Sequence, residues 1–163
     1  MKGEKDMANI LLTRIDNRLI HGQVAVTWVN HIEANLILVA DDKVAENSIQ
    51  QSLMDMAVPD VIETRYFTVQ ETIDNIGYAA DDQLIFLVVR TPQTLLRLVG
   101  GGVPIEKVNV GNMHYSEGKE QITSTVSVDE NDIETFKKLA ELGVEMDVRR
   151  VPDERGKDII SLI

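Results

Sequence analysis

The stretch QLIFLVV (residues 83–89) decides the fold of this chain. After Gln83 it is apolar at every position. A strand that shows one face to water alternates apolar and polar residues, whereas a strand covered on both faces is apolar throughout. The segments ILLT (10–13), NLILVA (35–40) and, more weakly, KVNV (107–110) follow the same pattern. These segments predict a parallel sheet with helices on both sides.

The segments between these strands have the apolar spacing of helices. Helices are predicted over 22–32, 43–56, 69–79, from Thr91-Pro92 to Gly100, and over 129–142, with further strands over 64–68 and 144–148. Residues 121–128 alternate, as in an edge strand or an extended loop. The prediction is an α/β fold: a three-layer α/β/α sandwich with an open, mainly parallel central sheet of about six to seven strands. Residues 7–163 are expected to form one domain, after a tag remnant or upstream extension over 1–6.

The composition excludes several classes of protein. The chain has 163 residues, a formal net charge of −11 and no cysteine. Disulfides and thiolate metal sites are thereby excluded, and the acidity argues against a nucleic-acid partner. No apolar run approaches the ~20 residues of a membrane helix. We expect no signal peptide, because residues 1–6 are mostly charged and lead into no apolar segment with a small-residue cleavage site. The three histidines lack the spacing of a zinc site, and the glycines lack a nucleotide-binding motif, so no metal or cofactor is predicted.

Polar residues gather where strands pass into helices, which is where open α/β sheets bind their ligands. The junctions read RIDNRLIHGQ (14–23), DDK (41–43), RTP (90–92), GNMHYSEGK (111–119) and RRVPDERGK (149–157). If the last strand continues, Arg149 and Arg150 point to opposite faces, so at most one of them reaches a site directly.

The first junction, RIDNRLIHGQV (14–24), carries the richest chemistry. His21 and Gly22 stand at a predicted helix start, where free amide groups and the helix dipole favour an anion. Arg14 and Arg18 add forked donors for phosphate oxygens, and a neutral imidazole can take up a phosphoryl group. Asp16 would orient the imidazole or hold an arginine. Two other interpretations stay open: a helix-capping histidine beside solvated arginines, and a general base in a hydrolase.

Other junction residues are secondary candidates for a phosphate site. Arg90 ends a strand and faces either the site or solvent. His114 lies in a glycine-flanked loop, close to a ligand or bonded to backbone. Lys119, in the same loop, could contact phosphate. Trp28 is expected in the core or in a patch that faces a partner.

At this point the sequence resembles a known family: the IIB subunits of the mannose–fructose–sorbose family of the sugar phosphotransferase system. The resemblance extends from about Met7 to the C-terminus. It is carried by RIDNRLIHGQV and by NLILVADD (35–42), VVRTP (88–92), GGVPIEKVNVGNMHYSEGKEQI (101–122) and TVSVDENDI (125–133). NVGNMHY followed by the glycine-lysine pair is most similar to the N-acetylgalactosamine-specific members.

The resemblance implies a cytoplasmic phosphocarrier, peripherally associated with a membrane permease. His21 would accept a phosphoryl group from a phosphohistidine of the IIA subunit and pass it to a sugar bound by the membrane IIC–IID complex. Arg14, Asp16, Arg18 and Gln23 match the active-site loop, with Asn17 and Gly22 as supporting residues. Neither a metal nor a cofactor is implied, and the protein itself would not insert into the membrane. The alternative is a non-catalytic regulator that binds a phosphorylated ligand at the same loop.

A further hypothesis concerns charge. On an acidic protein, Arg14, Arg18 and Lys119 would together form a basic crater that marks one docking face.

Overall fold

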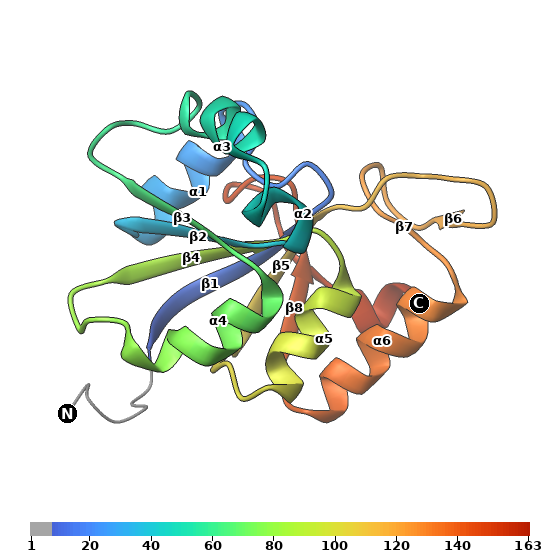
Figure 1. Ribbon diagram of the computed structural model, residues 1–163. Coiled ribbons are helices and arrows are strands. Elements are labelled where there is room, and N and C mark those ends of the chain that lie inside the picture. The colour runs from blue at the N-terminus through green and yellow to red at the C-terminus, as the bar shows by residue number, and fades with distance from the viewer. Residues whose placement is uncertain (1–7) are drawn as a thin grey trace.

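A computed structural model describes residues 8–163, and its centre is a seven-stranded sheet (Figure 1). The strands lie in the order β3-β2-β4-β1-β5-β8-β9. All neighbouring pairs are parallel except β8 and β9, which are antiparallel. The strands are β1 (Asn9–Asp16), β2 (Leu36–Ala40), β3 (Glu63–Phe67), β4 (Leu84–Val89), β5 (Lys107–Asn112), β8 (Glu145–Val148) and β9 (Lys157–Asp158). The predicted fold class is confirmed.

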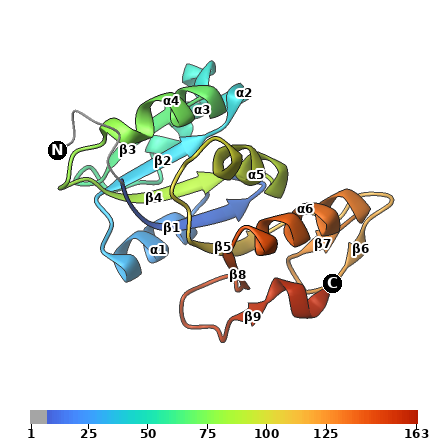
Figure 2. The same ribbon diagram turned by 90° about the horizontal axis from the view of Figure 1, so that it is seen from below.

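Helices cover both faces of the sheet (Figures 1 and 2). One face carries α1 (Val24–Ile32), α2 (Asp42–Ala45) and α3 (Ser48–Asp55); the other carries α4 (Val69–Asn75), α5 (Pro92–Gly100) and α6 (Glu130–Glu141). Burial on both faces of the sheet explains why the sequence of β2 is continuously apolar. Ile37 and Val39 belong to the core cluster that includes Trp28, while Leu36 and Leu38 belong to the cluster on the other face.

Side-chain caps fix where most helices begin. The side chain of Thr91 accepts a hydrogen bond from the amide of Thr94 and is followed by Pro92 at the first helical position. Thr68 and Asp129 each form a reciprocal capping box with the third residue of the following helix. Helix α1 differs, because Gln23 at its N-cap position makes no side-chain capping bond. Its first amide groups are therefore left without a side-chain acceptor.

Several parts of the structure differ from the sequence prediction. The helix predicted over 43–56 is interrupted between α2 and α3, where Asn47 caps the second helix by accepting from the amide of Gln50. Residues 121–128 contribute to a small antiparallel pair, β6 (Glu120–Gln121) with β7 (Ser127–Val128). The C-terminal β9 and the 3-10 turn η2 (Ile159–Leu162) were not predicted. A second 3-10 turn, η1 (Ile76–Tyr78), ends the segment predicted as a helix over 69–79.

The most consequential difference is the length of β1. The strand continues to Asp16, so Arg14 and Asp16 are strand residues and not parts of an exposed turn. Their position beside β4 and β5 buries both side chains. The extension predicted over residues 1–6 lies outside the described residues. Within residues 8–163, no helix has both the length and the apolar character needed to cross a membrane.

Candidate functional site

The loop after β1 begins at a fully buried carboxylate. Asp16 has no exposed surface, and its Oδ2 accepts hydrogen bonds from Nε of Arg14 at 3.3 Å and Nη2 at 3.1 Å. Its Oδ1 accepts from the backbone amide of Arg18 at 2.9 Å and from Nε of the same residue at 3.3 Å. Asp16 therefore holds two arginines and the backbone of the loop. Of the two roles predicted for it, this geometry supports holding an arginine.

Arg14 lies deeper than the sequence suggested. Only 2% of the residue is exposed, and its guanidinium also donates to the side chain of Asn109 and, at 3.2 Å, to the carbonyl of Arg150. It stands 5.7 Å from the centre of the Trp28 ring. Burial lowers the pKa of Arg14, an effect that the charge and hydrogen bond of Asp16 partly offset. Arg14 thus fixes the base of the loop from inside the protein.

Asn17 then ties the loop to two neighbouring strands. Its amide donates to the carbonyl of Asn112 at 3.1 Å, and its side-chain Nδ2 donates to the carbonyl of Arg90 at 3.1 Å. Arg90 returns a bond from Nη1 to the carbonyl of Asn17 at 2.8 Å and forms an ion pair with Asp41. The backbone amide of His114 donates to Oδ1 of Asn17. Arg90 and His114 therefore hold Asn17 in place.

His21 follows a buried segment and is itself exposed. Leu19 and Ile20 are buried, with Leu19 in the left-handed region at φ 59°. Within the part of the chain that the structure describes, the imidazole of His21 has no hydrogen-bond or ion-pair partner. Gly22 has a φ of +49°, which favours glycine, and Gln23 leads into the uncapped start of α1. A free imidazole thus stands beside amide groups that can bind an anion.

Lys119 is less available than predicted. Its Nζ contacts Oδ2 of Asp132 at 2.7 Å and Oδ2 of Asp129 at 3.6 Å. Burial lowers the pKa of Lys119, but the two carboxylates outweigh this and raise it. Lys119 does border the same depression of about 470 Å³ as Asn17, Arg90 and His114. The hypothesis of a basic crater is nevertheless wrong, because Arg14 is buried and Lys119 is paired.

Sequence reasoning missed two residues that support the site. Asn109 is fully buried in β5 and joins Arg14 to the carbonyl of Arg149, to which its Nδ2 donates at 2.9 Å. Gly111 leaves room for the Arg14 guanidinium: a Cβ there would lie 2.1 Å from Cζ of Arg14. Asn109 could have been found from the sequence, because it is a polar residue inside an otherwise apolar strand segment. Trp28 is confirmed as a core residue, and its indole donates to the carbonyl of Arg150 at 3.1 Å.

No group of three potential metal-ligating His, Cys, Asp or Glu side chains occurs among residues 8–163. The chemistry that this edge of the sheet offers is that of a free imidazole, uncapped helix amides and the partly exposed guanidinium of Arg18. An unpaired imidazole beside anion-binding groups is suited to nucleophilic attack on phosphorus.

Comparisons with known proteins place this chain in a family. Residues 10–163 match the family described as "PTS system sorbose subfamily IIB component". The N-acetylgalactosamine-specific phosphotransferase enzyme IIB component 2 of Escherichia coli K12 is 54% identical over 157 residues, which cover 96% of this chain and 100% of that protein.

Two crystal structures have the same fold. The N-acetylgalactosamine-specific IIB component 1 of Escherichia coli superposes with a TM-score of 0.90 at 50% identity, over 92% of this chain and 99% of that one. The N-acetyl-galactosamine IIB component of Streptococcus pyogenes gives a TM-score of 0.92 at 40% identity, over 97% and 99% of the two chains.

The fold and these matches define a phosphocarrier of sugar transport, a protein that accepts and passes on phosphoryl groups. The chain belongs to the sorbose subfamily of IIB components of the phosphotransferase system, within the mannose family of permeases.

Proposed function

We propose that this chain is the IIB component of a permease for N-acetylgalactosamine or a related amino sugar or hexose, and that His21 carries the phosphoryl group. The observation that carries the proposal is the exposed, unpaired imidazole of His21 on a loop whose base is fixed by Asp16 and Asn17. The choice of sugar is supported by the N-acetylgalactosamine-specific relatives, which are 54% and 51% identical to the chain.

In the first step, a nitrogen of His21 attacks the phosphorus of a phosphohistidine on the IIA subunit. The new N–P bond forms as the donor's N–P bond breaks, and the donor imidazole takes back the electron pair. The uncapped amides of α1 and the guanidinium of Arg18 stabilise the negative charge on the phosphoryl oxygens during transfer. Gly22 gives those oxygens a close approach to the backbone. Arg14 and Asp16 act through Arg18, which they position.

In the second step, a hydroxyl of the sugar attacks the phosphorus on His21. A P–O bond forms, the N–P bond breaks, and the released imidazole can take the hydroxyl proton. The sugar would be held by the membrane IIC–IID complex, which places this chain at the cytoplasmic face of the membrane as a peripheral partner. Gln23, Arg90, His114 and Lys119 are assigned supporting roles, with Arg90 and His114 acting through Asn17.

The test is transfer of labelled phosphate from phosphorylated IIA. We expect the wild type to acquire an acid-labile, base-stable phosphate, and His21→Ala to acquire none. His31→Ala is the matched control, because it removes an imidazole from the far end of α1, and it should label normally. Failure of the wild type to label, or full labelling of His21→Ala, would reject the catalytic role and favour a regulator. Turnover of sugar phosphate without any partner would indicate a hydrolase instead.

The choice of sugar requires a second assay, in vesicles that contain IIC and IID. A panel of amino sugars and hexoses should show phosphorylation of N-acetylgalactosamine or a close analogue. Transfer to hexoses that lack the amino group, with none to amino sugars, would overturn that choice and leave the carrier role intact.

A further inference from the structure

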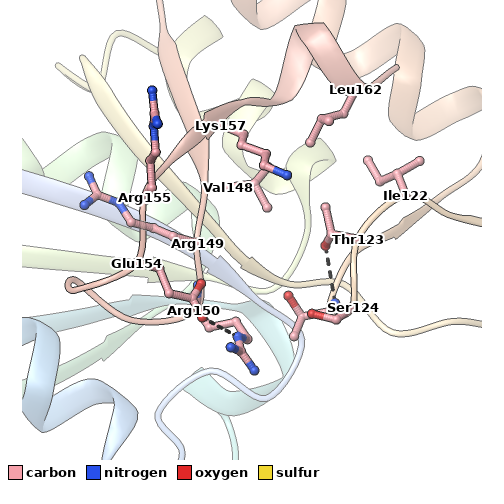
Figure 3. A pocket seen from close by; sticks show the side chains of 11 residues that line it. Ile122, Thr123, Ser124, Val148, Arg149, Arg150, Glu154, Arg155, Lys157 and Leu162 are labelled. Atoms are coloured by element: carbon pink, nitrogen blue, oxygen red, sulfur yellow. Dashed lines mark hydrogen bonds and ion pairs between the residues drawn. The ribbon is translucent and has the colours of Figure 1, made fainter.

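A cationic pocket lies beside the active-site loop and takes no part in the function proposed above (Figure 3). It measures about 500 Å³ and opens between the C-terminal turn (149–157) and the turn over 122–125. Its charged lining consists of Arg149, Arg150, Glu154, Arg155 and Lys157, and its apolar lining of Ile122, Val148 and Leu162. A concentration of positive charge on a chain of net charge −11 is the feature to explain.

Two of the four cations are engaged by the protein itself. Nε of Arg149 contacts Oδ2 of Asp147 at 2.6 Å, and Nε of Arg150 pairs with Glu154. Arg155 and Lys157, by contrast, have no carboxylate partner within the described part of the chain. Lys157 extends into the space between the two turns, as Figure 3 shows. The pocket therefore keeps two positive charges that form no ion pair with any carboxylate of residues 8–163.

Hydrogen bonds join the pocket to both ends of the active-site loop. The carbonyl of Arg150 accepts hydrogen bonds from Nη1 of Arg14, in the strand before the loop, and from Nε1 of Trp28, in the helix after it. Asn109 holds the carbonyl of Arg149 in the same way. A protein that presents a phosphohistidine to His21 must approach this edge of the sheet, where the pocket also opens.

We infer that the pocket docks an acidic segment of the phosphorylated IIA donor, with a carboxylate at Lys157 and an apolar side chain against Ile122 and Leu162. This inference rests on the proposed function. The pocket combines apolar and cationic side chains, and protein interfaces use such a combination to join burial with charge steering. Elsewhere the net negative charge of the chain opposes an acidic partner, so the pocket selects the docking orientation.

The charge balance favours the donor over the membrane acceptor. Before transfer, the phosphoryl group adds negative charge to IIA, and the unpaired cations attract it. After transfer, that charge resides on His21 of this chain and offsets the same cations. Attraction is therefore strongest for the loaded donor and weakest after delivery, which promotes release of the spent donor.

The test uses the full chain with Arg155→Glu and Lys157→Glu combined. Both side chains are exposed and unpaired, so the melting temperature should match that of the wild type. The control combines Lys107→Glu and Lys137→Glu, which make the same change of charge at exposed positions of β5 and α6. Initial rates of phosphoryl transfer are measured against the concentration of phosphorylated IIA, at low and at high salt.

We expect the KM for phosphorylated IIA to rise tenfold or more at low salt in the pocket variant, with kcat unchanged. The control should change by less than twofold, and the difference between the variants should shrink at high salt. An unchanged KM, or an equal rise in the control, would overturn the docking role. Normal KM together with binding of hexose 6-phosphate that requires Lys157 would reassign the pocket to a small phosphate ester. Absence of transfer to the wild type would instead reject the function of His21.

Discussion

Replacing Gly111 by alanine tests the buried arrangement that supports the loop. The new Cβ would lie 2.1 Å from Cζ of Arg14 and 2.3 Å from Nη1 and Nη2. Gly111 sits where the pairing of β1 with β5 shifts register, between Val110 and Asn112, so the strand is held on both sides. The guanidinium must therefore leave, and it forfeits its bonds to Asp16 and Asn109 and to the carbonyl of Arg150.

The loss of stability in Gly111→Ala follows from the buried carboxylate of Asp16, which loses the Arg14 guanidinium as a partner. Breaking a buried ion pair by removing one partner costs about 3–5 kcal/mol. Arg18 still contacts Asp16 after Arg14 leaves, so the lower end applies, about 3 kcal/mol by the same principle. For a protein of this size, 1 kcal/mol shifts the melting temperature by about 2–4 °C. The expected decrease for Gly111→Ala is therefore roughly 6–12 °C.

Thermal unfolding followed by circular dichroism measures this decrease. Gly100→Ala is the matched control, because no heavy atom lies within 4 Å of its Cβ position at the end of α5, and it should not lower the melting temperature. In an Arg14→Met background, Gly111→Ala should lower the melting temperature much less, since the guanidinium that the new Cβ would displace is absent. A decrease below about 2 °C for Gly111→Ala alone would refute the reasoning, because such a shift corresponds to less than about 1 kcal/mol.

Three further predictions concern the loop and its surroundings. Arg18→Ala, which removes a side chain that is 33% exposed, should slow labelling of His21 severalfold and lower the free energy of unfolding by only about 0–1 kcal/mol; equal rates would contradict its role. Gly22→Ala should lower the free energy of unfolding by about 1–2 kcal/mol, because alanine is strained at a φ of +49°. It should also slow the transfer of phosphate to His21. A melting temperature equal to that of the wild type would contradict the strain. Asp132→Asn should destabilise at pH 7. Burial raises the pKa of Asp132, but bonds from Lys119 and Gln93 hold it below its ordinary value of 3.8. Its contribution to stability is therefore present above that value and is lost as pH falls through the lowered pKa. A difference in the free energy of unfolding, measured in urea, that does not shrink as the pH is lowered below 3.8 would count against this pairing.

Much of the fold could be predicted because burial on both faces leaves a direct trace in the sequence. Strands β2 and β4 are apolar throughout, and Thr91-Pro92 marks a helix start by local chemistry alone. The break between α2 and α3 escaped prediction, since apolar spacing continues across it while the cap at Asn47 decides the boundary. Strand β9 is two residues long and exposed, so only its pairing with β8 defines it.

The sequence predicts where the site lies in the fold, but not which of its side chains bond to one another. The rule that loops gather at the carboxyl edge of a parallel sheet located His21, Arg18 and Arg90 correctly at one edge. Charged residues such as Arg14 and Asp16 suggest a turn when only the local sequence is considered. Their burial depends on Asn109 and on the carbonyl of Arg150, which are distant in the sequence. Lys119 likewise had no local sign that Asp132 would neutralise it.

The way the loop is held has a consequence for the entropy of docking. Folding already fixes the segment from Asp16 to Ile20, through the carboxylate, Asn17 and two buried side chains. Only His21, Gly22 and Gln23 remain exposed before α1 begins. Ordering a residue costs about 1–2 kcal/mol. The carbonyls of His21 and Gln23 already accept hydrogen bonds from the amides of Val24 and Thr27, so a partner that orders this segment pays at most roughly 3–6 kcal/mol. For a carrier that accepts and then passes on a phosphoryl group, a small ordering cost lets each encounter be both specific and brief.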